Sequence, residues 1–182
     1  MHVPLLIHYS RMLQQGAKCD LDTTNIMPTL TVYLDTCCLN RPFDDQTQDR
    51  IHLEAEAILL ILTHIEAGRW QWIGSEILDF EIEQTPDQER RERVKSLATY
   101  VHRPVPIEQP EIERAQQLEA LGIHPFDALH LACAESGSAS IFLTTDDELL
   151  RLATHLSRQL RVRVENPLTW LNEVTEKWIY ER

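Results

Sequence analysis

The sequence lacks the features that mark membrane proteins and disulfide-bonded secreted proteins. Its 182 residues contain no uninterrupted apolar run near the ~20 residues that a membrane helix needs. The apolar opening, VPLLI, is shorter than the apolar region of a secretory signal peptide, which has ~7–15 residues. The four cysteines form no CxxC pair, and we expect them to be reduced and buried. These absences predict a soluble, cytoplasmic protein.

Positive charge is also in the minority. The chain has 17 Lys and Arg against 29 Asp and Glu, which gives a formal net charge of −12. Tight non-specific binding to nucleic acid is therefore not expected, because such binding depends on Lys and Arg displacing phosphate counterions. A nuclease whose site is a carboxylate cluster stays compatible with this balance, because bound metal ions reverse the sign of the charge where the phosphate lies.

One stretch of the chain is locally basic. It contains Arg90, Arg91, Arg93, Lys95 and Arg103. This stretch could contact a nucleic-acid backbone, whereas Glu89 and Glu92 beside it fit a solvated, salt-bridged helix face.

Length and composition indicate one structural domain. An apolar content of 43% over 182 residues is enough for one well-packed core and rather little for two. Residues 1–26 show no sustained periodicity, so we expect a flexible or loosely docked N-terminal extension, with Met27 as an alternative natural start. The domain itself is predicted to span residues 27–182.

Apolar periodicity within the domain predicts alternating strands and helices. Strand patterns occupy residues 30–36, 70–75, 140–145 and 160–166, with a possible short strand around Val105. Helical spacing is found in residues 46–67, 75–82, 87–101, 111–121, 125–136, 147–156 and 168–179. The segment NRPFDDQ is predicted to be a loop, and Cys37 and Cys38 are expected on opposite faces of an extended chain. This order predicts an α/β fold with a mostly parallel sheet and helices on both faces.

Four acidic residues are predicted to meet at one edge of that sheet. Asp35 ends the first strand, Asp146 follows SIFLTT, Asp127 opens a helix, and Glu81 lies on the helix after the second strand. Ligands of open parallel sheets bind at the carboxyl ends of the strands. Four carboxylates at one edge would repel each other unless cations were bound, and oxygen ligands suit Mg²⁺ or Mn²⁺ better than zinc. Each acid taken singly is more often a turn or cap residue, so the hypothesis depends on their combination.

Metal ions in such a site can activate water, orient a phosphate and stabilise a leaving oxygen, so no covalent nucleophile is needed. The sequence accordingly has no GxSxG elbow, HExxH pair, P-loop or GxGxxG motif. A DxD phosphatase loop is disfavoured because TCC follows Asp35.

The segments VYLDTCCLN, SEILDFEIE, FDALHLACA and FLTTDDELL resemble, in this order, the four acidic motifs of PIN-domain nucleases. The best-known members are the toxins of bacterial VapBC-type pairs, and the resemblance spans about residues 30–170. It implies that Asp35, Glu81, Asp127 and Asp146 are the catalytic, metal-binding quartet, with Thr144 or Thr145 as an orienting hydroxyl. It further implies an endoribonuclease with Mg²⁺ or Mn²⁺, an RNA substrate, a cognate antitoxin and a homodimer. The alternative is a catalytically silent PIN-like module that binds RNA or protein.

The chain departs from the family pattern after the first acid. Cys37 and Cys38 stand where many members carry Ser or Asn. Asn40, further on, is a candidate for contacting a metal-bound water or for shaping the following turn.

Several residues near the predicted site have more than one possible role. Glu76, Asp79 and Glu83 are alternatives to Glu81. His130 shares a helix face with Asp127, and we expect it to be a core or rim histidine, not a base. Trp70 and Trp72 could stack on bases, but their spacing of two favours packing on one buried face.

Overall fold

The computed structural model of the chain describes residues 30–180, and both the predicted extension at residues 1–26 and Met27 lie outside this range. Five strands form one sheet in the order β3-β2-β1-β4-β5, and every neighbouring pair is parallel. The strands are β1 (Thr31–Leu34), β2 (Gln71–Ser75), β3 (Arg103–Val105), β4 (Ile141–Leu143) and β5 (Arg163–Glu165). The predicted parallel α/β sheet is confirmed, including its short strand at Val105.

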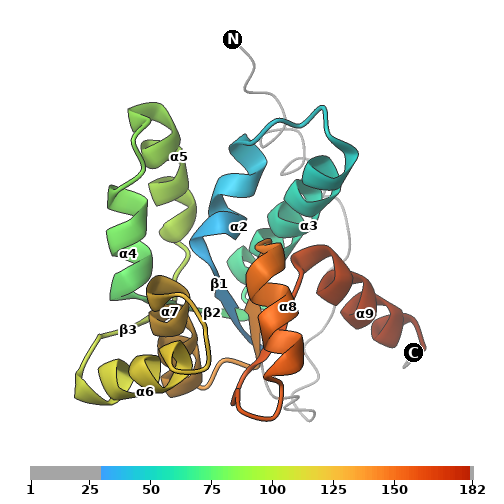
Figure 1. The fold of residues 1–182 in the computed structure, drawn as a ribbon. Helices are drawn as coiled ribbons and strands as arrows, with labels where there is room; N and C mark the ends of the chain where they lie inside the picture. The colour runs from blue at the N-terminus through green and yellow to red at the C-terminus, as the bar shows by residue number, and fades with distance from the viewer. Residues whose placement is uncertain (1–29, 181–182) are drawn as a thin grey trace.

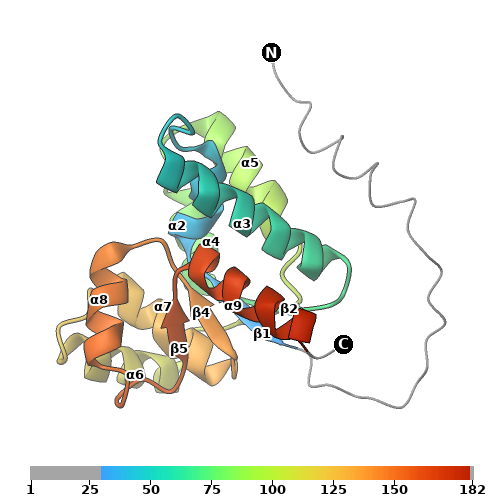
Figure 2. The ribbon, with the colours of Figure 1, turned by 90° about the vertical axis from the view of Figure 1, so that its right-hand side faces the viewer.

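Helices cover both faces of the sheet (Figures 1 and 2). They are α2 (Thr36–Asn40), η2 (Arg41–Phe43), α3 (Asp49–Glu66), α4 (Glu76–Glu83), α5 (Gln88–Ala98), α6 (Gln109–Glu119), α7 (Pro125–Ser136), α8 (Asp147–His155) and α9 (Pro167–Tyr180). Side chains of α3, α5 and α9 pack on one face, and those of α6, α7 and α8 pack on the other. None of the helices in residues 30–180 combines the length and the apolar character needed to cross a membrane.

Alternating side chains of the central strands supply the two cores. Val32 and Leu34 of β1 belong to the α3 side, whereas Tyr33 between them belongs to the α7 side. Trp70 and Trp72 are both buried in the α3-side core, and the rings of Trp70 and Trp170 have centroids 4.9 Å apart. The packing interpretation of these two tryptophans is confirmed.

The segment after β1 differs from the prediction. The strand ends at Leu34, and a helix, α2, begins at Thr36, so Cys37 and Cys38 lie on a helical turn and not on opposite faces of a strand. Part of the predicted NRPFDDQ loop is helical too, because η2 follows directly. Burial of Cys38 and Leu39 against the sheet accounts for the helix, because this tertiary contact outweighs the β-like local composition.

A close contact sets the distance between α7 and the sheet. A Cβ atom added at Gly137, the residue after α7, would lie 2.7 Å from Ile73 Cγ2 and 3.1 Å from Val105 Cγ2. Only glycine fits here without displacing a strand side chain. The helix that carries Asp127 therefore packs tightly beside β2 and β3.

Candidate metal centre

The four predicted acids lie in one pocket at the carboxyl edge of the sheet. Asp35 follows β1, Glu81 lies on α4 after β2, Asp127 lies in the first turn of α7, and Asp146 precedes α8. All four line a cavity of about 380 Å³. The other lining residues are Thr36, Cys37, Phe80, Gln84, Thr85 and Phe126. The expected convergence of the quartet is thus present in the structure.

Asp35 is buried and held by two side chains. The Thr144 hydroxyl donates to Asp35 Oδ2 at 2.7 Å, and the Cys37 thiol donates to the same oxygen at 3.1 Å. The backbone N–H of Asp146 in turn donates to the Thr144 hydroxyl at 3.1 Å. Thr144 therefore joins the first and the last acid of the quartet, and Cys37 makes a second polar contact with the first.

The Thr145 side chain has a different environment. Its hydroxyl is buried and has no hydrogen-bond partner among the described residues. Its backbone N–H donates to Cys37 Sγ at 3.2 Å, and its carbonyl accepts from Arg41 Nη2 at 3.3 Å. Of the two threonines, Thr144 is the one whose hydroxyl orients an acid.

Asp146 is fixed by the helix that it begins. Its Oδ1 accepts the backbone N–H groups of Glu148 at 2.7 Å and Leu149 at 3.0 Å, so the side chain is the N-cap of α8. Its Oδ2 has no hydrogen bond within residues 30–180, which leaves this oxygen available to a ligand in the pocket.

A buried ion pair supports the loop before α8. Arg41, whose guanidinium reaches the Thr145 carbonyl, lies with Nε 3.0 Å from Glu54 Oε2, and Glu54 is only 2% exposed. Arg50 also contacts Glu54, at 2.9 Å, and pairs with Asp147 at 2.6 Å. These contacts connect α3 to the loop and so restrict where Asp146 can lie.

Glu81 is held by a chain of hydrogen bonds that the sequence analysis missed. Glu81 Oε2 accepts from the Thr36 hydroxyl at 2.6 Å and lies 2.8 Å from His130 Nε2. His130 is buried, and its Nδ1 lies 2.7 Å from the Tyr33 hydroxyl, which is itself 2.5 Å from Ser75 Oγ. Both imidazole nitrogens are therefore engaged, which makes His130 a positioning residue for Glu81.

His130 also lies close to Asp35. One ligand-type atom from each of Asp35, Glu81 and His130 lies within 4.8 Å of the others. The sequence predicts that His130 lies in the core or at its rim, and the burial of this side chain confirms the prediction. Its i, i+3 relation to Asp127 was the only sequence signal for its contact with the acids.

The pKa shifts reflect the crowding of charge. Burial lowers the pKa of His130. The hydrogen bond to Glu81 and the charges of Asp35, Glu81 and Asp127 together raise this pKa by more, so it lies above its usual value. Burial raises the pKa of Glu81, and the contacts with His130 and Thr36 reverse that shift. Burial together with the charges of Asp35 and Asp146 raises the pKa of Asp127 to about 6.

The acids near Glu81 face other partners. Glu76 Oε2 accepts the backbone N–H of Ile107 at 2.9 Å, and Glu83 pairs with Lys95 at 2.7 Å. Asp79 is exposed and does not line the pocket. The geometry therefore favours Glu81 over all three alternatives as the second acid.

Asn40 lies at the end of α2 and not among the pocket residues. Its side-chain amide donates to the Thr36 carbonyl at 3.0 Å, a contact within its own helix. This contact fits the alternative in which Asn40 shapes the turn.

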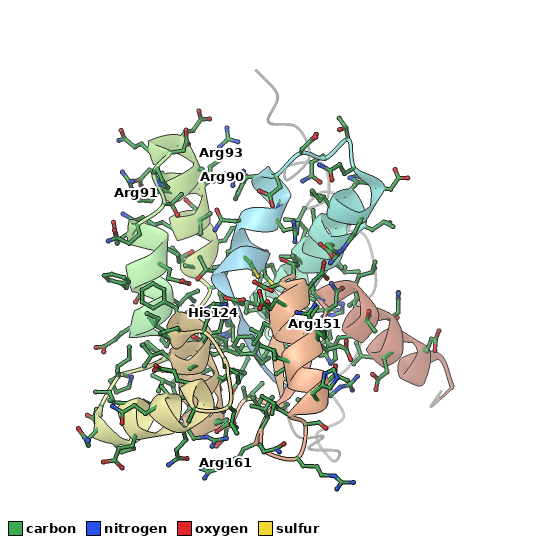
Figure 3. All side chains as sticks on the ribbon, in the orientation of Figure 1. Arg90, Arg91, Arg93, His124, Arg151 and Arg161 are labelled. Carbon is green, nitrogen blue, oxygen red and sulfur yellow. The ribbon has the colours of Figure 1, made fainter. Side chains whose placement is uncertain are left out.

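Figure 3 labels the three arginines of α5, which are Arg90, Arg91 and Arg93. These arginines differ in their partners. Arg90 pairs with Asp44 at 3.0 Å, and Arg93 pairs with Glu89. Arg91 has no acidic partner among the described residues, and its Nη1 donates to the carbonyl of Thr85, a pocket residue, at 2.6 Å. The salt-bridged interpretation thus fits Arg90 and Arg93, whereas the charge of Arg91 is not neutralised by an acid in the described part of the chain.

With this geometry established, comparison with known proteins gives the family. The PIN domain family model matches residues 32–154, a range that contains the whole quartet. The chain belongs to the PIN domain family. No curated protein matches it. A similar chain is found in a solved structure of VapBC2 from Rickettsia felis, which is bound to a DNA fragment from the VapBC2 promoter. The identity is 16%, the coverage is 75% of this chain and 98% of that chain, and the TM-score is 0.46.

The residues of the pocket fit a divalent metal ion, the kind of cofactor that PIN nucleases typically use. Asp35, Glu81 and His130 bring ligand-type atoms within 4.8 Å of one another, and Asp127 and Asp146 line the same pocket. Carboxylate oxygens suit cations that prefer oxygen ligands. Burial, followed by the charges of Asp35 and Asp146, raises the pKa of Asp127, and a bound cation would favour its ionised form.

Replacing Asp127 with Asn should stabilise the metal-free protein above pH 6. Because folding raises the pKa of Asp127 from 3.8 to about 6, the folded state holds this proton more tightly than the unfolded state. The contribution of Asp127 to the free energy of unfolding therefore falls as the pH rises from 3.8 to about 6, and it stays low at higher pH. The asparagine side chain cannot ionise, so the advantage of the variant should grow by on the order of 1 kcal/mol between about pH 4 and about pH 7.5, allowing for solvent screening.

Urea unfolding in EDTA at both pH values measures this difference, with the exposed-site variant Glu119→Gln as control. A stability difference between Asp127→Asn and wild type that does not change with pH would contradict the crowding of carboxylates.

Removing the imidazole of His130 should weaken metal binding. In His130→Ala the Glu81 carboxylate loses a hydrogen bond that fixes its orientation, and loss of such supporting contacts typically reduces metal affinity roughly 10–100-fold. Tyr33→Phe, which removes only a buried hydroxyl, should have a smaller effect in the same direction. Calorimetric titration with Mn²⁺ measures both, with His52→Ala on the exposed side of α3 as control. Unchanged Mn²⁺ affinity in folded His130→Ala protein would show that His130 does not position Glu81.

Proposed function

We propose that this protein is a divalent-metal-dependent endoribonuclease in which Asp35, Glu81, Asp127 and Asp146 hold Mg²⁺ or Mn²⁺. The observation that carries the proposal is the meeting of four carboxylates from four separate segments in one cavity of about 380 Å³. Membership of the PIN domain family supports nuclease chemistry at this site. A carboxylate whose pKa is raised to about 6, in a pocket lined by three other acids, is the kind of perturbed group that gathers at functional sites.

The side chains of the pocket have separable tasks in this proposal. A divalent metal, when bound, activates water and stabilises negative charge on the phosphate. Asp35, held by Thr144, and Glu81, held by His130 and Thr36, present fixed oxygens to the cavity. Asp146 presents Oδ2, because Oδ1 is used in capping α8.

The substrate in this proposal is RNA, and its phosphate backbone needs cationic contacts. The net charge of −12 makes general attraction of RNA to the protein weak. Of the three arginines on α5, Arg91 is the one suited to a phosphate contact, because it lacks an acidic partner among the described residues and adjoins Thr85. Arg90 and Arg93 contribute less, because their charges are paired.

The biological role that we propose is the toxin of a type II toxin–antitoxin pair in the cytoplasm. This role, the cognate antitoxin and a homodimeric assembly are supported by the resemblance of the four acidic motifs to those of VapBC-type toxins. The catalytically silent module is the competing function, and the test of cleavage separates the two.

Purified protein should cut a mixed RNA pool in Mg²⁺ or Mn²⁺ and should not cut it in EDTA. Asp35→Asn and Asp127→Asn should each reduce the rate at least about a hundredfold, because each removes a charge that holds the metal ion. Gel analysis of the RNA measures the rate, and Glu83→Gln, outside the pocket, is the matched control. Uncut RNA with every metal, in folded protein free of antitoxin, would favour the silent module.

A further inference from the structure

Two phenylalanines lie exposed at the rim of the carboxylate pocket. Phe80 is 49% exposed and Phe126 is 48% exposed, and both line the pocket. Phe80 lies on α4 directly before Glu81, and Phe126 lies on α7 directly before Asp127. Their ring centroids are 6.0 Å apart with the ring planes at 60°. Two helices thus deliver one aromatic pair to the same place where they deliver two of the acids.

Packing alone does not explain the pair. An isolated exposed apolar side chain is common on protein surfaces. Here two large rings are half exposed and meet across two helices, whereas Phe142, in β4, is fully buried. The contact between Phe80 and Phe126 shields only part of each ring, so a flat apolar group could cover more of both.

We propose that Phe80 and Phe126 form a stacking platform for an unpaired nucleobase beside the phosphate held at the carboxylates. The inference rests on the proposed function and adds two residues that would contact the RNA, Phe80 and Phe126. A base in a duplex has both faces covered by its neighbours and cannot reach the platform without leaving the stack, which costs a few kcal/mol. Stacking accepts any base, so the platform selects for unpaired structure and not for sequence.

The charge of the protein makes such a contact important. Affinity from counterion release is limited in a chain of net charge −12. Arg91 is a cation without an acidic partner in the described part of the chain, and it contacts the pocket residue Thr85. Figure 3 shows Arg91 on α5 and His124 at the beginning of α7, the helix that carries Phe126. Through Thr85, Arg91 adjoins the pocket that the aromatic pair lines.

The test uses single-stranded RNA of roughly 10 nucleotides, a length within the binding sites of single-strand-binding domains. The RNA carries 2-aminopurine at one position and random bases elsewhere, and the full chain binds it in EDTA, without cleavage. Wild-type protein should change the emission of 2-aminopurine. The double variant Phe80→Leu/Phe126→Leu should lose this change and bind about tenfold or more weakly, because leucine keeps the apolar character but has no ring.

Two controls separate stacking from general damage. Phe80→Tyr/Phe126→Tyr retains the rings and should retain the signal. Tyr100→Leu removes an aromatic side chain that is 37% exposed but does not line the pocket, and it should change nothing. Thermal melting verifies that each variant is folded.

Failure of this inference and failure of the proposed function give different results. If the leucine variant binds RNA and alters 2-aminopurine emission as wild type does, or if duplex RNA is cut as fast as single-stranded RNA, the platform is refuted. If no RNA is cut in any metal while the emission change still requires the two rings, the nuclease proposal fails and the base-binding inference stands.

Discussion

Repulsion among carboxylates is the constraint on which the rest of this site depends. Parallel strands bring the carboxyl ends of β1, β2 and β4 to one edge, and the segments that follow place four acids in one cavity. Burial and, after it, the charges of Asp35 and Asp146 raise the pKa of Asp127, so without a cation the ionised form of this side chain opposes folding. The surrounding structure must therefore hold each acid in place against the others, and most of the polar contacts near the pocket do so.

Three sets of contacts hold these acids, and each reaches into a different part of the fold. Thr144 joins Asp35 to the backbone of Asp146. The chain from Ser75 through Tyr33 and His130 to Glu81 links β2 and β1 to α7 and α4 on one side of the sheet. The Arg41–Glu54 pair ties the loop before α8 to α3. Because Tyr33 and His130 are buried on the α7 side, packing there fixes the geometry of Glu81. The packing that stabilises the α7 side of the sheet thus also fixes the Glu81 carboxylate.

The sequence predicts the acids better than it predicts their surroundings. Asp35 and Asp146 follow apolar, β-branched runs, so periodicity alone places them at strand ends. The α2 helix could not be predicted, because TCCLN becomes helical through burial against the sheet. The contact of His130 with Glu81 and the pairing of Phe80 with Phe126 each join α4 to α7. The sequence places His130 one helical turn from Asp127, but local patterns do not predict contacts between these two helices.

Anomalous diffraction from crystals grown with Mn²⁺ tests the central claim, that the quartet is a metal site, most directly. The account predicts an anomalous peak inside the pocket, with a carboxylate oxygen of Asp35 about 2.0–2.3 Å from the ion and oxygens of at least one further quartet member in its coordination sphere. Crystals saturated with Mn²⁺ that show no peak in the pocket, or a peak bound only by residues outside the quartet, would contradict it.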